Sequence, residues 1–293
     1  MTLRPVDKAT IGAKVLAPGP IPNSNMELFE TPKGFAMGFQ GRPDGAEPLQ
    51  FALGSNRIAF TFVNIVDNST VMELRQTYHS KASSWHLTPG QLAEDTASLG
   101  KVFNEFTSRR CIGCHVTALP ETTVTPEPRF YGVGCEACHG AGKKHVDAVL
   151  AGETQNLQME KLRNIGATKL NYICGSCHRT SRDVAPDEAD MTQRFAAYGL
   201  MKSRCYTESN DTLSCITCHD PHTNATVGAK SYDKACLSCH ASSKSSGMST
   251  FGPSTQKQKA CPVNPRTDCV SCHMPKRQAG PEALADHFIR VFH

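Results

Sequence analysis

Three apolar or alternating runs between residues 49 and 78 carry the clearest secondary-structure signal in the chain. The runs are LQFAL, IAFTFVNIV and TVMELRQTY, and the turn-forming stretches GSNR and DNS separate them. Short runs of this kind between turns are typical of antiparallel strands. The pattern predicts a small β-meander, and the Gly- and Pro-rich residues 1–45 before it predict an irregular arm.

Helical signals follow the meander. Thr88-Pro89 combines a helix-capping residue with a proline at the first helical position, which predicts a helix from there to Phe106. Apolar periodicity predicts further short helices at 142–151, 154–165, 190–203, 231–239 and 281–290. The polar stretch ASSKSSGMST and the FGPSTQKQK that follows it indicate a surface loop. No run approaches the roughly 18 apolar residues that a membrane helix requires, so we expect no membrane span.

Composition narrows the class of protein further. Of the 293 residues, 39% are hydrophobic, and 31 Lys and Arg against 27 Asp and Glu give a formal net charge of +4. No basic run stands out, so a nucleic-acid partner has no support. The informative numbers are 14 cysteines beside 12 histidines.

Twelve of the cysteines fall into six copies of C-x-x-C-H. The copies are CIGCH at 111–115, CEACH at 135–139, CGSCH at 174–178, CITCH at 215–219, CLSCH at 236–240 and CVSCH at 269–273. This motif is typical of covalent haem attachment. Its spacing lets both sulfurs leave one turn of backbone to form thioethers with the haem vinyl groups, and the adjacent His presents its ring to the iron.

The predicted cofactor is therefore haem c, in six covalently bound copies. The predicted attachment residues are Cys111, Cys114, Cys135, Cys138, Cys174, Cys177, Cys215, Cys218, Cys236, Cys239, Cys269 and Cys272. The predicted proximal iron ligands are His115, His139, His178, His219, His240 and His273.

Other uses of paired cysteines explain the pattern less well. Zinc sites need four ligands but no His directly after each second Cys. A disulfide between cysteines so close together closes a small strained loop and leaves the histidines unexplained. Thioredoxin-type motifs occur once or twice on a βαβ pattern, which this sequence lacks.

The motif spacing sets the expected architecture. About thirty residues serve each haem, which is too little chain to build a separate core around every one. We therefore expect a compact, mostly α and irregular fold with a minor N-terminal β-meander and a core formed by stacked haems. The expected domains are an arm and meander at 1–90 and a hexahaem domain at 91–293.

Six histidines remain outside the motifs, which is enough to give every iron a second His. They are His79, His86, His145, His222, His287 and His293. Each is a predicted distal ligand, although a spare His is ordinarily a surface residue. His222, in CHDPH, cannot reach the far side of its own haem and is expected to serve a neighbour. Met274 or Met201 could substitute as a ligand, but we expect methionines mainly to pack against porphyrin faces.

Several segments together resemble one group of proteins. They are GVGCEACHGAGKKH at 132–145, YICGSCH at 172–178, SRCY at 203–206, CITCHDPH at 215–222 and CVSCHMPK at 269–276. They are similar to the multihaem cytochromes that include the nitrifier tetrahaem electron carrier, pentahaem nitrite reductase and octahaem hydroxylamine oxidoreductase. FALGSNRIAFTF and SSWHLTPG look like the N-terminal part of environmental members. The resemblance implies closely packed parallel and perpendicular haem pairs, with His145 and His222 at distal-ligand positions.

A departure from that group bears on function. Its nitrite reductases usually carry Lys in place of the motif His at the catalytic haem, whereas all six motifs here end in His. An enzyme would need an open iron lined by substrate-binding groups. The candidates are Tyr131, Tyr172, Tyr206 and Arg204, which we expect instead to contact propionates or pack on haem.

We therefore predict electron transfer through six haems that are mostly or wholly bis-His ligated, and an electron carrier more than an enzyme. One alternative is an oxidoreductase that acts on a small nitrogen or sulfur compound at one open haem. Another is a subunit of an extracellular cytochrome filament, in which the N-terminal part lends a His to the next subunit. The expected partners are redox proteins, chiefly other cytochromes, with self-association into an oligomer or filament left open.

Covalent haem attachment also predicts a location, because it takes place outside the cytoplasm in an oxidising compartment. We expect a periplasmic or extracellular protein. The start MTLRPVDKAT lacks the layout of a signal peptide, so either a leader was removed or the start shown is incomplete. In such a compartment the two remaining cysteines, Cys205 and Cys261, suggest a disulfide.

Overall fold

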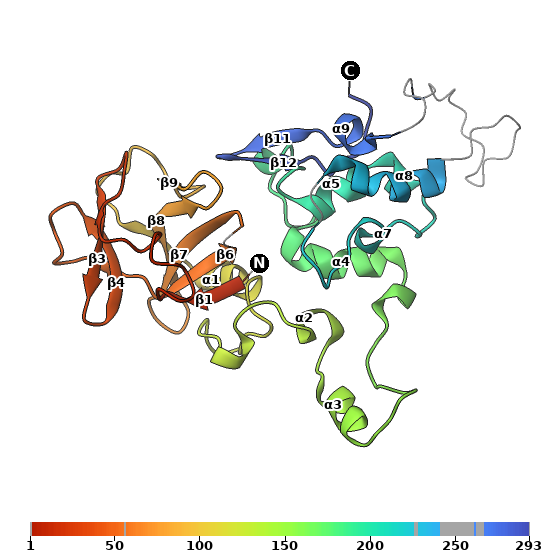
Figure 1. The fold of residues 1–293 in the computed structure, drawn as a ribbon, viewed down its shortest axis with the longest axis horizontal. Coiled ribbons are helices and arrows are strands. Elements are labelled where there is room, and N and C mark those ends of the chain that lie inside the picture. Colours follow the sequence, from red (N-terminus) through yellow and green to blue (C-terminus); the bar gives the residue numbers. More distant parts are fainter. Residues whose placement is uncertain (1, 56, 226–227, 241–260, 262–266, 293) are drawn as a thin grey trace, which may run out of the picture. The chain divides into compact units, whose positions relative to one another are not determined.

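The computed structural model describes residues 2–55, 57–225, 228–240, 261 and 267–292. They fall into two compact units, Met1–Met159 and Glu160–His293 (Figure 1). The first unit contains the cysteine-free part of the chain and two C-x-x-C-H motifs, and the second unit contains the other four. The surface loop predicted to begin at ASSKSSGMST lies outside the described residues.

The predicted meander is present within a larger antiparallel sheet of the first unit. Its strands are β6 (Phe51–Ser55), β7 (Ala59–Ile65) and β8 (Val71–His79). The full order is β1-β6-β7-β8-β10, and β9 also pairs with β8. The added strands are β1 (Thr2–Pro5), β9 (Ser84–Leu87) and β10 (Gly100–Phe103). Only glycine suits position 54, because its φ is +119° and a Cβ there would lie 2.2 Å from the Ala59 carbonyl oxygen.

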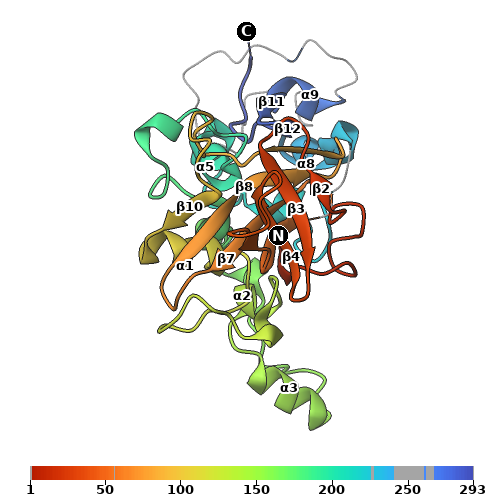
Figure 2. The same cartoon turned by 90° about the vertical axis from the view of Figure 1, so that its left-hand side faces the viewer.

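Residues 1–45 are not the irregular arm that their Gly and Pro content predicts. Besides β1 they form β2 (Gly19–Pro20), β3 (Met26–Thr31) and β4 (Gly34–Phe39), which join β5 (Glu47–Pro48) in a second antiparallel sheet. Figure 2 shows the hairpin that β3 and β4 form in the first unit. The glycines and prolines mark turns between short strands, and MELFET and GFAMGF supply the apolar side chains of those strands.

The first unit has a polypeptide core on both faces of its larger sheet. On one face, Leu28 and Met37 from the second sheet share a buried cluster with Phe60, Phe62 and Leu74. A second cluster on that sheet includes buried residues of β1, β6, β7 and β8 and also contains Ile112 of helix α1 (Glu105–Gly113). Haem is therefore not needed to fill the centre of this unit.

The helix predicted from Thr88 to Phe106 is wrong. Thr88 is buried and its hydroxyl donates to the Leu74 carbonyl oxygen at 2.8 Å, so it anchors the chain to β8. The segment continues through turns into β10. The helix begins later, as α1, where the Asn104 side chain accepts the Thr107 N–H at 2.9 Å.

Three short helical elements complete the first unit. They are η1 (Pro128–Phe130), α2 (Glu136–His139) and α3 (Lys143–Leu150). The last confirms the helix predicted at 142–151.

The second unit consists of short helices and one hairpin. The helices are η2 (Leu162–Asn164), α4 (Ala167–His178), η3 (Pro186–Glu188), α5 (Ala196–Lys202), α6 (Arg204–Thr207), α7 (Cys215–Cys218), η4 (Ala229–Tyr232), α8 (Asp233–His240) and α9 (Cys269–His273). The hairpin pairs β11 (Lys276–Ala279) with β12 (Glu282–Ala285).

Of the short helices predicted in this region, one is confirmed, two are partly helical and one is wrong. The helix at 231–239 is confirmed, whereas only parts of 154–165 and 190–203 are helical. The helix at 281–290 is wrong, because Gly280 at φ +68° makes a turn that returns the chain as β12.

The expectation of a mostly α and irregular fold is also wrong. About 28% of the described residues are helical and 23% are in strands, arranged in three sheets. The physical reason lies in the first unit, where two antiparallel sheets bury an apolar core of their own.

Candidate haem sites

Every C-x-x-C-H motif includes a helical turn. CIGCH begins in the last turn of α1, CGSCH and CLSCH end α4 and α8, and the other three motifs form α2, α7 and α9. Residues three apart on a helix lie on the same face, so each turn can direct two sulfurs to one side. This is the local geometry that attachment to one planar group requires.

The first motif is anchored by the core of the first unit. Ile112, the second residue of CIGCH, is fully buried, and the His115 carbonyl oxygen accepts the Leu3 N–H at 2.8 Å. Burial lowers the pKa of His115 to about 4, so the ring is neutral and can donate a lone pair to a metal. Its Nδ1 is buried without a hydrogen-bond partner.

The third and fourth motifs are brought together by Asn171 on α4. Its side-chain oxygen accepts the Cys215 N–H at 2.9 Å, and its amide donates to the Leu213 carbonyl oxygen at 3.1 Å. The Cys174 and Cys215 side chains form a hydrogen bond, which lowers the pKa of Cys174. The two turns that carry these motifs are therefore in contact.

The fifth and sixth motifs are joined by Asp233, the first residue of α8. Its carboxylate accepts the N–H groups of Asp268 at 2.7 Å and Cys269 at 2.9 Å, and the Thr267 hydroxyl at 2.9 Å. These backbone hydrogen bonds lower its pKa to about 2. The Cys236 and Cys269 side chains also form a hydrogen bond.

Three histidines gather in the second unit. The rings of His219 and His287 have centroids 6.3 Å apart, and His178 is close enough to affect the pKa of His287 electrostatically. Burial is the main cause that lowers the pKa of all three. His178 and His219 are predicted proximal ligands, whereas His287 is a predicted distal ligand, so the structure brings the two kinds together here.

Several of the predicted ligand histidines have one ring nitrogen held by a hydrogen bond to an oxygen acceptor. The Nδ1 atoms of His145, His273 and His287 lie 2.6, 3.1 and 3.0 Å from the carbonyl oxygens of Leu157, Arg290 and Ala285. Because a carbonyl can only accept, Nδ1 must carry the proton and Nε2 keeps its lone pair for a metal. His222 has the same arrangement, with Asp220 Oδ1 at 3.1 Å.

The remaining predicted distal ligands are placed differently. His79 is buried on β8, and its ring is perpendicular to that of His86 on β9 at 5.1 Å. The Nε2 of His86 is 2.9 Å from the Ser84 hydroxyl. His293 lies outside the described residues.

The residues considered for an enzymatic site each contact other protein groups. Tyr131 packs edge-on against Phe51, and burial raises its pKa. The Arg182 guanidinium lies over the Tyr172 ring. The remaining contacts are Tyr206 with Thr168 and Arg204 with Glu208.

The last two cysteines are free thiols in this structure, so the disulfide predicted between them is absent from it. Cys205 is half-buried in α6, and burial raises its pKa, whereas Cys261 is exposed. Among the described residues, no helix is long and apolar enough to cross a bilayer.

Asn171, Asp233 and Asp286 were not singled out from the sequence. Each acts on a partner far along the chain, and no spacing pattern marks such a residue. The only local signal is that Asp286 directly precedes a candidate ligand, His287.

A cavity lies between the fourth and fifth motifs, lined by Cys218 of one and Ser238 of the other. It has a volume of about 340 Å³ and is lined by Cys218, Tyr232 and Lys234, among others. The Tyr232 ring contacts that of His219 at 5.5 Å. The fit to haem rests instead on the donor set, because each motif places two cysteines on one helical turn with a His directly after them.

Two families match parts of the sequence. Residues 68–140 match the family described as cytochrome c554 and c-prime, and residues 209–245 match a doubled CXXCH motif. Together with the six C-x-x-C-H motifs, these matches identify the chain as a multihaem c-type cytochrome. It binds haem c and functions in electron transfer.

Individual relatives are similar over longer or shorter segments. The multiheme cytochrome MtrA of Shewanella baltica (strain OS185) is 25% identical over 242 residues, covering 64% of this chain and 70% of MtrA. Cytochrome c-554 of Nitrosomonas europaea is 35% identical over 75 residues, which are 24% of this chain and 32% of that protein.

Solved structures show a weaker likeness. The outer cell wall cytochrome OcwA has a TM-score of 0.48 at 14% identity, over 83% of this chain and 68% of OcwA. The undecaheme cytochrome from the S-layer of Carboxydothermus ferrireducens has a TM-score of 0.42 at 16% identity, over 83% of this chain and 45% of that one.

Proposed function

We propose that the chain carries six c-type haems, each ligated by two histidines, and passes electrons along them between partner proteins. The observation that carries this proposal is the presence of all six C-x-x-C-H motifs on helical turns, two pairs of which are in contact. The partners we propose are other cytochromes, and the proposed location is the periplasm or the cell exterior.

The chain's own residues determine which attachment points are neighbours. When bound, haem supplies a one-electron iron centre. Asn171 holds the third and fourth attachment turns together, and Asp233 holds the fifth and sixth. Haems attached to these neighbouring turns would lie close together, so the protein's contribution would be to fix their spacing and the orientation of their ligands.

The histidine tautomers support a second His ligand on each iron. His145, His222 and His287 each keep Nε2 available because an oxygen acceptor holds Nδ1–H. Three predicted distal ligands are thus prepared to bind a metal through the same nitrogen. We extend this to every iron, with His79, His86 and His293 as the remaining distal ligands.

The haem count is tested by the intact mass of the purified mature protein. We expect the polypeptide mass plus six haems, with each haem mapped by peptide digestion to one motif. A matched variant, Cys174→Ala with Cys177→Ala, should lose one haem. A wild-type mass with five haems or fewer would contradict the proposal.

A further inference from the structure

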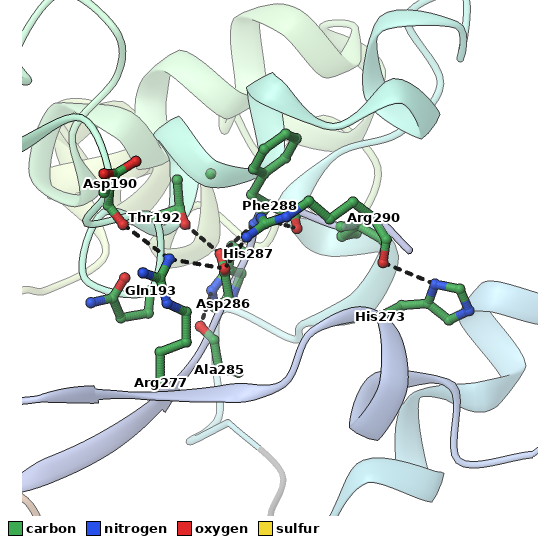
Figure 3. A network of polar contacts seen from close by, with 12 residues as sticks. Asp190, Thr192, Gln193, His273, Arg277, Ala285, Asp286, His287, Phe288 and Arg290 are labelled. Atoms are coloured by element: carbon green, nitrogen blue, oxygen red, sulfur yellow. Dashed lines mark hydrogen bonds and ion pairs between the residues drawn. The ribbon is translucent and has the colours of Figure 1, made fainter. Parts of the chain in front are cut away.

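A buried carboxylate holds the chain directly beside His287. Asp286 is wholly buried, and its Oδ1 accepts the Thr192 hydroxyl and the Phe288 N–H, the latter at 3.0 Å. Its Oδ2 lies 3.4 Å from Arg277 and 3.2 Å from Arg290. Figure 3 shows these contacts converging on Asp286 from the segment at 190–193, from β11 and from the C-terminal segment.

Helix α5 and the residue after it hold the same segment from another side. The Ser203 hydroxyl, fully buried, accepts the Ile289 N–H at 2.8 Å and lies 3.3 Å from the His287 carbonyl oxygen. Gly199 permits this approach, because a Cβ there would lie 3.0 Å from the His287 carbonyl carbon and 2.8 Å from the Thr192 carbonyl oxygen. The backbone of His287 is therefore fixed on both sides.

The distance from His287 to His219 matches that of two ligands on one metal. A metal–imidazole bond of about 2.0 Å, with about 1.1 Å from the nitrogen to the ring centre, separates the centres of two opposed rings by about 6.2 Å. The centroid distance in this structure is 6.3 Å. The 36° angle between the ring planes is compatible with this, since each ring can rotate about its bond to the metal.

The surroundings of His219 provide an independent indication. The cavity of about 340 Å³ is lined by Cys218, the attachment residue next to His219. Tyr232, which also lines it, contacts the His219 ring. The cavity therefore lies beside Cys218 and is connected to the His219 ring through Tyr232, and Lys234 adds a positive group suited to a propionate.

We propose that His219 and His287 are the two axial ligands of one haem attached at Cys215 and Cys218, and that Asp286 is the positioning residue that holds His287 in place. The inference rests on the proposed bis-His ligation. Asp286 acts through the backbone of its neighbour, and two arginines offset its buried charge.

Ligation by His287 is tested first with carbon monoxide, which binds reduced irons that have an open position. The His287→Ala protein, with all six haems confirmed by mass, should bind one carbon monoxide per protein, whereas the wild type should bind none. No uptake by the variant would overturn the inference. Uptake by the wild type would instead contradict the proposed ligation, so the two failures are distinguishable.

The pairing is tested by the double variant His219→Ala, His287→Ala. One iron should be open if both residues serve the same haem, and two open irons would overturn the pairing. If this variant does not mature, Cys215→Ala with Cys218→Ala provides a second route. In that background His287→Ala should add no further uptake, whereas in Cys269→Ala, Cys272→Ala it should add one equivalent.

The role of Asp286 is tested with Asp286→Ala and the milder Asp286→Asn. A positioning role predicts that six haems remain while one changes from a low-spin to a high-spin electron paramagnetic resonance signal. Added imidazole should restore the low-spin signal. Asp187→Asn, which removes an exposed carboxylate of the same unit, should leave all signals unchanged. Unchanged low-spin signals in both Asp286 variants would overturn this role.

Discussion

At the scale of single residues, the ligands and their anchors differ in how far the sequence reveals them. Each C-x-x-C-H motif holds the two cysteines and the His within five positions, so its predicted attachment residues can be named from the sequence alone. The anchors act across the chain instead. Asn171 bonds a backbone group 44 residues away, and Asp286 bonds a hydroxyl 94 residues away. No local spacing encodes such pairs, so sequence reasoning missed them.

Asn171 provides the residue-scale prediction. Asn171→Ala leaves the Leu213 carbonyl and the Cys215 N–H without this partner, and an unsatisfied buried polar group costs about 1–3 kcal/mol. We expect the free energy of unfolding of the second unit to fall by about 2 kcal/mol, measured by urea denaturation followed through haem absorption. The matched control is Asn164→Ala at an exposed position. Equal stability of the two variants would show that Asn171 does not hold the third and fourth attachment turns together.

At the scale of elements, a turn in one unit and a tertiary hydrogen bond in the other overrode the local helix signals. The apolar spacing at 281–290 resembles a helix, yet the turn at Gly280 and pairing with β11 make its first part a strand. At 88–106 the buried Thr88 hydroxyl bonds to β8, and the helix begins only at Glu105. Local helix signals, whether a capping pair or apolar spacing, are least reliable in short segments that form strong contacts with distant parts of the chain.

Asp233 gives the element-scale prediction, because it joins α8 to α9. Its pKa is about 2 in the folded chain, below the ordinary 3.8, so its stabilising effect is full above about pH 4 and is lost as the pH falls through 2. We expect circular dichroism in the haem absorption band to change in this window.

The control for Asp233 is Asp233→Asn, which cannot titrate. The difference between wild type and variant isolates the contribution of this carboxylate from those of other acids. Identical acid titrations of the two proteins would show that Asp233 does not hold the α8–α9 junction.

At the scale of the whole molecule, the two units depend on haem to different degrees. The first has an apolar core between two sheets, whereas the described buried apolar residues of the second are few and small apart from Leu170, Phe195 and Leu200. The spacing of the motifs predicted a haem core throughout the chain. The second sheet was not predicted, because its strands are short and separated by Gly and Pro.

This difference predicts how a haem-free variant behaves. With the twelve motif cysteines replaced by serine, the first unit should still unfold cooperatively. Trp85 reports this transition, because its ring packs on Phe62 and Tyr78 in that unit. It is the single tryptophan of the chain, so its fluorescence reports that unit alone. The helical circular dichroism should decrease in the same protein. A non-cooperative fluorescence transition would contradict an independent core.

The central claim is that histidines close every iron and leave an electron carrier without an open haem. Carbon monoxide titration of the dithionite-reduced wild-type protein, followed by visible absorption and referenced to haem content, tests it most directly. We expect no uptake of carbon monoxide. One equivalent bound per protein would contradict it, and would favour an oxidoreductase with one open haem.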